Sequence, residues 1–415
     1  MGIQRSSFYF MVARVVFVAS AYVLHVFTAY YFNDPVLYGN LAVALSISSI
    51  GLVFIQFGFP QSISKFISEN RLQSYEVFLA GRYVYMIFGF IIFLTYLCFT
   101  PLWVYITKDS SFIYILLVSS MLIPLFSYNN SFMAYLNGCQ RFKEQAFFVA
   151  LYPLNRIFFA IIFILLGFEI CGVFAGFVCA CIINAVLLRK KIHQKQGNKK
   201  FSSEPIVKFA IPIVFMSIGI SLYMSMDMII IKYFYQDSDV VGFYAASSAI
   251  SKIPYYIYFA YSMTLIPIIS RYINISMHNE SICIIKKCLY TLCSMIAVSS
   301  IIVAMFSTEI IDFVYPKGYS SLAHVMSILF LSMGILSLFQ TLSSIFISIN
   351  NVYISAIVIY CILVMEVGMS VYSIPRFGII GMAYSSIIPV IFGSVTLMVL
   401  LLHRLKEIGT CIKSL

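Results

Sequence analysis

The chain has 415 residues, of which 62% are hydrophobic and only 10% are charged, and its mean hydropathy is +0.98. Soluble domains carry roughly 25% charged residues, because their surfaces must face water. The composition therefore excludes a large water-soluble protein and indicates that lipid surrounds most of the chain.

Apolar runs long enough to cross a membrane follow one another along the sequence. A spanning helix needs about 20 mostly apolar residues. Such runs occur at 7–32, 41–63, 77–99, 111–136, 144–166 and 171–189, and then at 208–232, 243–270, 284–307, 320–348, 352–373 and 379–402. The first run is about twice as long as the core of a signal peptide, so we expect it to be retained as a span. The sequence thus predicts an all-α integral membrane protein with about twelve transmembrane helices.

The lysines and arginines predict how these helices are oriented. With the N-terminus in the cytoplasm, nineteen of the 26 basic residues lie on the inner side, four lie in outer turns and three lie inside spans. Cytoplasmic loops are enriched in lysine and arginine, so both termini are expected to face the cytoplasm. The net charge of +11 is then an orientation signal, and no nucleic-acid partner is needed to explain it.

Short segments of the first half recur in the second half. The matched segments, all at nearly the same offset, are 33–39 with 236–242, 63–67 with 269–273, and 168–172 with 377–381. Six spans separate the copies, so the two repeats keep the same orientation and predict a pseudo-twofold axis along the membrane normal. We expect an N-terminal six-helix bundle at 1–190, a basic cytoplasmic linker at 191–205 and a C-terminal six-helix bundle at 206–415.

Charged side chains inside the predicted spans are the strongest candidates for a functional site. The five are Arg14, Arg156, Lys252, Asp227 and Glu366. Each costs at least about 2.5–3.5 kcal/mol at a bilayer centre, so all five facing lipid would cost on the order of 12–17 kcal/mol. They are therefore expected to face a wet cavity or one another.

Two interpretations of these charges remain open from the sequence. One is structural: Arg156 pairs with Glu366, and Arg14 extends its charge to the membrane surface. The other is functional: three cations against two acids leave a mildly cationic interior, which suits a ligand with a phosphate or diphosphate group.

The other polar motifs do not indicate a metal-binding or catalytic site. Asp237-Ser238-Asp239 is similar to the metal-binding motif of glycosyltransferases, but it stands where the first repeat has the turn at 33–34. Such a turn with a helix cap accounts for these residue types. The ten cysteines show no metal-binding spacing. No catalytic residue, metal site or cofactor is expected.

Several motifs together resemble a known family. They are the acidic turn ending in Tyr38-Gly39, the Gly-Phe-Pro-Gln run at 58–61 before Ser64-Lys65-Phe66, the helix opening at 208–212, the segment around Asp227, the turn ending at Gly242 and the Gly-Phe pair at 167–168. Over essentially its whole length the chain resembles the polysaccharide flippases of the MATE/MOP exporter superfamily. The resemblance is strongest to the O-antigen (Wzx-type) flippases.

The resemblance implies a function as well as a fold. Such flippases move an undecaprenyl-diphosphate-linked oligosaccharide, an O-antigen or capsule repeat unit, from the inner to the outer leaflet of the bacterial inner membrane by alternating access. Related flippases of lipid-linked precursors bind the diphosphate with arginines of the first and eighth helices. Arg14 and Lys252 occupy those helices here, although lysine lacks the bidentate geometry of arginine.

The other charges inside the predicted spans and the expected partners complete this hypothesis. Arg156 is a third candidate cation for substrate binding, and Asp227 and Glu366 are candidates for ion coupling. The expected partners are the lipid-linked oligosaccharide diphosphate and membrane lipids, with a polysaccharide polymerase and a chain-length regulator as further candidates. The chain lacks a thirteenth and a fourteenth span, which argues against the branch that flips peptidoglycan precursors.

Two alternatives differ in class. A multidrug or cation antiporter of the same fold would need an acidic cavity. A membrane-bound polymerase or glycosyltransferase would need catalytic groups outside the membrane, but the predicted outer segments are short and hold no carboxylate pair at convincing spacing. The sequence therefore favours a transport protein over an enzyme.

Overall fold

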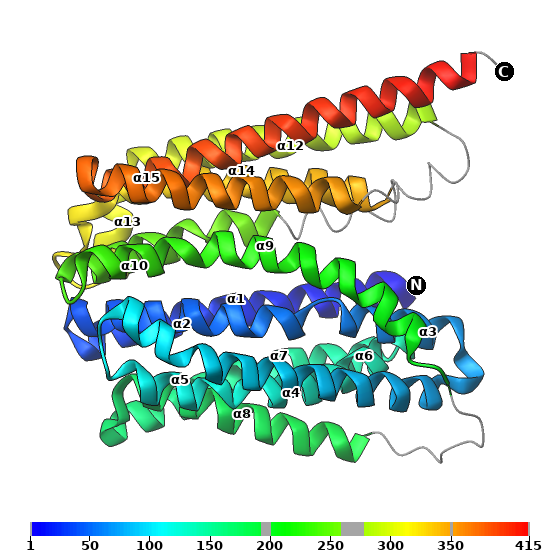
Figure 1. Ribbon diagram of the computed structural model, residues 1–415, viewed down its shortest axis with the longest axis horizontal. Helices are drawn as coiled ribbons and strands as arrows, with labels where there is room; N and C mark the ends of the chain where they lie inside the picture. Colours follow the sequence, from blue (N-terminus) through cyan, green and yellow to red (C-terminus); the bar gives the residue numbers. More distant parts are fainter. Residues whose placement is uncertain (1, 192–200, 259–277, 349–351, 414–415) are drawn as a thin grey trace. The chain divides into compact units, whose positions relative to one another are not determined.

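The computed structural model describes residues 2–191, 201–258, 278–348 and 352–413, and within these ranges every regular element is helical (Figure 1). The first half contains α1 (Gly2–Phe32), α2 (Pro35–Gln56), α3 (Phe59–Glu69), η1 (Arg71–Gln73), α4 (Ser74–Thr107), α5 (Phe112–Ser120), α6 (Leu122–Gly138), α7 (Phe142–Phe163), η2 (Ile164–Phe168) and α8 (Glu169–Lys191). The second half contains α9 (Glu204–Tyr235), α10 (Asp239–Ser251), α12 (His278–Met305), α13 (Ser307–Val314), η3 (Tyr319–Leu322), α14 (Ala323–Ser348) and α15 (Val352–Lys413).

The predicted second span is broken in the structure. Gly58 separates α2 from α3 and has a φ of +84°, which residues with a Cβ rarely adopt. A Cβ at this position would lie 2.7 Å from the carbonyl oxygen of Ala210. Pro60 follows in the first turn of α3, where its missing N–H costs no helical hydrogen bond. The run 41–63 therefore forms two helices with a kink between them.

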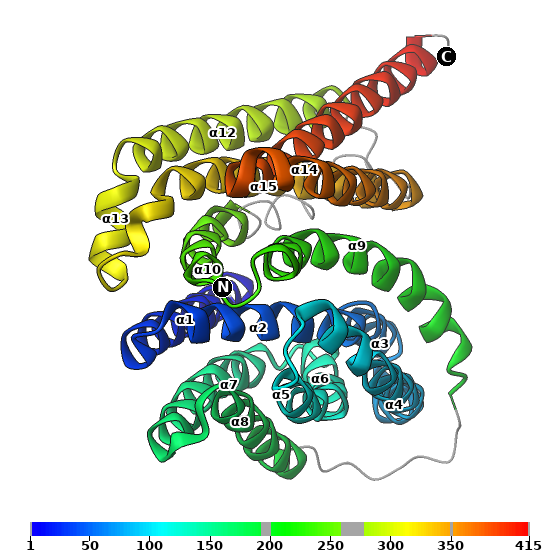
Figure 2. The same ribbon diagram turned by 60° about the vertical axis from the view of Figure 1, so that its left-hand side comes forward.

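Two long apolar segments each fold back on themselves. The segments 142–191 and 353–403 are 50 and 51 residues long, so each as one straight helix would extend about 75 Å, more than twice the hydrocarbon thickness. The first reverses at Gly167 (φ 88°), and α7 then packs along α8 (Figure 2). The second reverses at Gly378 (φ 62°), and the Ser373 hydroxyl before the reversal donates to the Gly381 carbonyl after it at 3.0 Å. Each segment thus supplies two spans.

The backbone repeats at positions that the sequence matches between the two halves. Asn33 and Gln236, which open one pair of matched segments, both have positive φ, at 47° and 49°. Glu169 (φ 45°, ψ −128°) and Gly378 (φ 62°, ψ −144°), equivalent positions of another pair, share a rare conformation. The second member of the third match, 269–273, lies outside the described residues. Both halves therefore use the same turns at equivalent positions.

Within the described ranges, nine segments are long and apolar enough to cross a membrane. Two of them are the hairpins above. The predicted eighth span at 243–270 begins in α10, and its residues 259–270 lie outside the described part. The expected all-α multi-pass membrane fold is thus confirmed.

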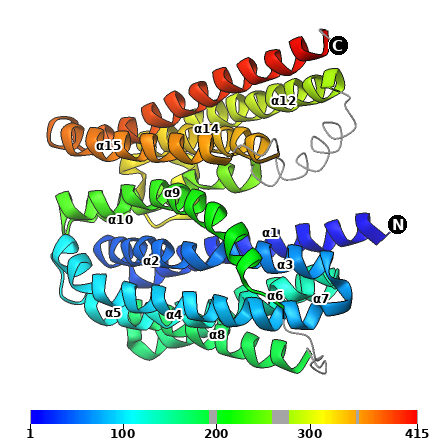
Figure 3. The same cartoon turned by 45° about the vertical axis from the view of Figure 1, so that its right-hand side comes forward.

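The chain forms two compact units, which we call the N-terminal bundle (Met1–Phe32 and Asn40–Ser221) and the C-terminal bundle (Asn33–Gly39 and Leu222–Leu415). In the N-terminal bundle, α6 packs against α3, α4 and α8, and α1 packs against α7. In the C-terminal bundle, α14 packs against α10, α12 and α15 (Figure 3). The predicted boundaries at 190 and 206 stay a prediction, because residues 192–200 of the linker lie outside the described residues.

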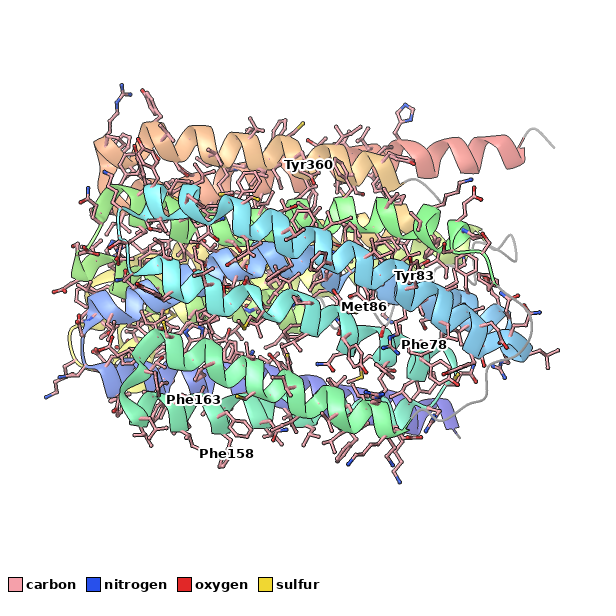
Figure 4. All side chains as sticks on the ribbon, turned by 60° about the horizontal axis from the view of Figure 1, so that its bottom comes forward. Phe78, Tyr83, Met86, Phe158, Phe163 and Tyr360 are labelled. Carbon is pink, nitrogen blue, oxygen red and sulfur yellow. The ribbon has the colours of Figure 1, made fainter. Side chains whose placement is uncertain are left out.

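Large apolar side chains cover the outside of the helices as well as the inside. Phe78 is buried, whereas Phe158 projects away from its helix with 59% of its surface exposed (Figure 4). Tyr83 is likewise 70% exposed. Exposed aromatic and aliphatic side chains in such numbers mark a surface that contacts lipid rather than water.

Candidate functional site

The five predicted intramembrane charges fall in both bundles. Arg14 is on α1 and Arg156 on α7, both in the N-terminal bundle. The side chain of Arg14 lies outside the described part of the chain. Asp227 on α9, Lys252 at the end of α10 and Glu366 on α15 all belong to the C-terminal bundle.

Arg156 lies among aromatic rings. Its guanidinium carbon is 4.8, 5.5 and 6.0 Å from the ring centroids of Phe177, Phe17 and Tyr152, respectively. Its Nη2 donates a long hydrogen bond of 3.4 Å to the Ser20 hydroxyl. Its Nε is buried and has no hydrogen-bond partner among the described residues. Because rings stabilise a cation without occupying its N–H groups, Arg156 keeps donor capacity for a ligand.

Asp227 is held by hydrogen bonds from its own bundle. It is 2% exposed, and its Oδ2 accepts from the hydroxyl of Tyr244 at 3.2 Å and of Ser248 at 3.0 Å. Its Oδ1 accepts from the backbone N–H of Met228 at 2.8 Å. These three donors offset part of the cost of burying the carboxylate.

Glu366 is less well satisfied. It is 1% exposed, and its Oε1 accepts one long hydrogen bond of 3.4 Å from Ser386, while its Oε2 has no donor within the described ranges. Both Asp227 and Lys252 interact electrostatically with it. We call Asp227 and Glu366 the acidic pair. The structure thus brings together three of the five predicted charges, two acids and one cation.

The Arg156–Glu366 pair of the structural alternative would join the two bundles and stays a prediction. Arg156 contacts side chains of α1, α7 and α8, whereas Glu366 contacts Ser386. In the part of the chain that the structure describes, neither of them nor Lys252 forms a salt bridge.

The N-terminal bundle also contains a cavity of about 520 Å³ that the sequence did not predict. It lies among α1, α2, α3, α6, α7 and α8, and its polar lining includes Lys65, Asn129, Asn130, Asn137, Gln145 and Asn184. The side-chain oxygens of Asn129, Gln145 and Asn184 are buried and accept no hydrogen bond from the described residues. The signal that could have indicated the cavity is the presence of several amide side chains inside otherwise apolar runs.

The acidic motif at 237–239 is a turn with a helix cap, as expected. Ser238 caps α10 by accepting from the Val240 N–H at 3.4 Å. Asp237 accepts from the ammonium of Lys232 at 2.6 Å. Lys232 lies in the last turn of α9, and its side chain is fully buried.

Comparison with solved structures identifies the fold. An inward-facing multidrug-resistance MATE family transporter of the MOP superfamily aligns with a TM-score of 0.81 at 12% identity, over 96% of this chain and 99% of that one. A MOP superfamily transporter from Pyrococcus furiosus, described as having a binding pocket of reversed polarity, aligns with a TM-score of 0.70 at 12% identity, over 98% and 96%. A MATE transporter in a bent conformation aligns with a TM-score of 0.69 at 14% identity, over 99% and 96%.

The chain is therefore a multi-pass membrane protein with the fold of the MATE/MOP transporters. Residues 3–273 match the family of polysaccharide biosynthesis proteins, and the chain belongs to that family. No curated protein matches its sequence. Family and fold together indicate a membrane transporter or flippase rather than a catalytic enzyme.

Proposed function

We propose that this protein is a flippase that moves an undecaprenyl-diphosphate-linked oligosaccharide, an O-antigen or capsule repeat unit, from the inner to the outer leaflet of the bacterial inner membrane. The proposal rests on one observation, the combination of a polysaccharide biosynthesis family with a MOP transporter fold. Polysaccharide repeat units are built on lipid carriers. A transporter of that family would therefore have such a lipid as its cargo.

The cations of the interior would bind the diphosphate. A diphosphate is costly to take into hydrocarbon, so a flippase must offer it compensating charge. Arg156 suits this role because its aromatic surroundings leave its Nε without a partner among the described residues. We assign the same role to Arg14 and Lys252. The polyprenyl tail would stay in lipid while the bundles alternate between inward and outward access.

The acidic pair would bind the coupling cation. Two buried carboxylates in one bundle repel each other, and a bound proton or sodium ion relieves that repulsion. The Oε2 of Glu366, which has no donor in the described part of the chain, is the atom best suited to receive the ion. Movement of the ion down its gradient would then drive the change between the two access states.

The proposed orientation places both termini in the cytoplasm, as the distribution of basic residues predicts. The oligosaccharide would enter from the cytoplasmic side, where the repeat unit is assembled. A polysaccharide polymerase and a chain-length regulator would act on it after release.

Deletion of the gene tests the cargo. We expect loss of the surface polysaccharide and accumulation of lipid-linked repeat units inside the cell. Intact polymer would contradict the proposal. Increased sensitivity to cationic drugs with intact polymer would instead support the alternative, a multidrug or cation antiporter.

Point variants in the complemented strain test the cations. Arg14→Ala, Arg156→Ala and Lys252→Ala should each reduce surface polysaccharide at unchanged protein levels. The matched control is Arg376→Ala, because Arg376 is exposed and stacks on Tyr372 with its guanidinium carbon 3.7 Å from the ring centroid. Normal polymer in all three interior variants would contradict the binding role.

Transport by the purified protein in vesicles tests the coupling. A pH or sodium gradient should accelerate flipping by the wild type, and Glu366→Gln should remove that acceleration while leaving the gradient-independent rate. An unchanged response of Glu366→Gln to both gradients would contradict coupling through the acidic pair.

A further inference from the structure

The cavity of the N-terminal bundle points to a ligand that donates hydrogen bonds. We propose that this cavity is a subsite for one sugar unit of the cargo, an inference that rests on the proposed function. Its volume of about 520 Å³ lies within the range of about 300–1,000 Å³ typical of small-molecule sites. It is large enough for a sugar ring with its hydroxyl groups.

Three unsatisfied acceptors define the chemistry of the cavity. The side-chain oxygens of Asn129, Gln145 and Asn184 are buried without a hydrogen-bond partner among the described residues, and the three residues are only 4%, 8% and 3% exposed. A buried acceptor without a donor is costly. Since these three come from three different helices and line one cavity, a ligand that presents several O–H groups would satisfy them together. A sugar is such a ligand.

The amide of Asn129 is already oriented for this role. Its Nδ2 donates to the backbone carbonyl of Cys181 on α8 at 3.0 Å. This hydrogen bond uses the nitrogen of the amide as a donor and sets the orientation of the side chain. The oxygen end is therefore the one available to the ligand.

Aromatic side chains complete the lining. Phe126 and Tyr152 pack edge to face, with ring centroids 5.3 Å apart, and both line the cavity together with Phe148. The C–H face of a sugar ring packs well against such apolar surfaces. Among the described residues that line the cavity there is no carboxylate, and the one charged side chain is Lys65, so a cationic drug would find no counter-charge there.

The amides that line the cavity differ in exposure. Gln56, Gln61 and Asn137 are exposed, whereas Asn129 and Asn184 are buried. Gln56 and Gln61 lie on either side of the kink between α2 and α3. A sugar would pass the exposed amides and reach the buried acceptors.

Arg156 adjoins the cavity and connects the subsite to the rest of the cargo. Phe17 and Tyr152 line the cavity, and the same two rings contact the Arg156 guanidinium. Tyr152 and Arg156 are one helical turn apart on α7. In a sugar linked to a diphosphate the two groups are neighbours, so a sugar in the cavity would place its diphosphate towards Arg156.

Binding and flipping by the purified full-length protein in vesicles test the subsite. Two probes are used: undecaprenyl diphosphate without sugar, and the undecaprenyl-diphosphate-linked oligosaccharide extracted from a strain that lacks this chain. The variants are Gln145→Leu and Asn184→Leu, with Gln340→Leu as matched control. Gln340 is also a buried amide whose oxygen has no partner within the described ranges, but it lies on α14.

The subsite predicts that the wild type binds the sugar-bearing probe more tightly than the bare diphosphate. Each cavity variant should lose about two- to tenfold in affinity for the sugar-bearing probe. Neither variant should change affinity for the bare diphosphate, and Gln340→Leu should match the wild type with both probes. If a leucine variant does not fold, as judged by its thermal midpoint, Asn184→Ala replaces it.

The remaining outcomes separate the two proposals. Equal affinity of the wild type for both probes, or cavity variants that keep full affinity for the sugar-bearing probe, would overturn the subsite and leave the flippase intact. A wild type that neither binds nor flips either probe would overturn the proposed function itself, and the subsite with it.

Discussion

Replacement of Arg156 by methionine separates a functional cation from a structural one. The change removes the guanidinium and keeps a flexible apolar side chain of similar length. Three cation–π contacts disappear, each contributing about 0.5–1 kcal/mol. The cost of holding a charge in the membrane interior, about 2.5–3.5 kcal/mol, disappears as well. The two changes nearly cancel, so the free energy of unfolding should change by less than about 1 kcal/mol.

Transport by Arg156→Met should fall much more than its stability does. A charged hydrogen bond to a diphosphate contributes about 1.5–3 kcal/mol, which corresponds to roughly a 10- to 150-fold loss of affinity. Arg156→Met should therefore show a nearly unchanged thermal midpoint, together with a large fall in flipping of the lipid-linked oligosaccharide in vesicles. Arg156→Lys should retain part of the activity, because it keeps the charge but loses the planar fork of donors.

Arg376→Met provides the control for both measurements, since it removes another cation stacked on an aromatic ring, at an exposed position. The reasoning about Arg156 would be refuted by full transport activity in Arg156→Met. It would equally be refuted if Arg156→Met unfolded as easily as a variant that has lost a core contact, because the loss of folded protein would then account for the lost activity.

Three further predictions concern the C-terminal bundle. A Cβ at Gly242 would overlap the backbone carbonyl oxygen of Pro35, so Gly242→Ala should lower the free energy of unfolding by about 1–3 kcal/mol in a melting assay. The control is Gly368→Ala, which should not destabilise the protein, because the space around a Cβ at that position is open. Glu366→Gln should melt at or above the wild-type temperature, because it removes repulsion within the acidic pair, and a clear fall would show that the ionised carboxylate is needed for folding. Burial raises the pKa of the Tyr315 hydroxyl from 10 to about 12, so its contribution to stability is complete below pH 10 and is lost as the pH rises to about 12. Denaturation between pH 10 and 12 should show the wild type losing about 2 kcal/mol more than Tyr315→Phe, and parallel curves would contradict this.

Features that depend on short stretches of sequence could be predicted. The spans follow from runs of about 20 apolar residues. The turns at Asn33 and Gln236 follow from a local pattern of polar residues, and their backbone angles agree closely. The reversal at Gly378 could be placed for the same reason, since the repeat aligns it with Glu169.

A kink inside an apolar run could not be predicted from hydropathy. The run 41–63 contains Gly58, and its hydropathy predicts one helix. Hydropathy does not register a positive φ, and the close approach of the Ala210 carbonyl that requires glycine there comes from α9, which is distant along the chain. Hydropathy likewise gives no sign that the side chain of Lys232 is buried at the end of α9, where Asp237 forms an ion pair with it at 2.6 Å.

The sequence by itself determined that lipid is the solvent of this protein, that the chain crosses it repeatedly in two related halves, and which charged residues fall inside its apolar runs. Each of these depends only on the identity and order of neighbouring residues. The tertiary structure decided which polar side chains meet. The rotation of each helix about its axis is set by packing, as where Gly176 allows α8 to approach the backbone of α7 at Ala160. That packing directs Asn129 and Asn184 into one cavity and places Lys252 near the acidic pair, and no local pattern in the sequence encodes either arrangement.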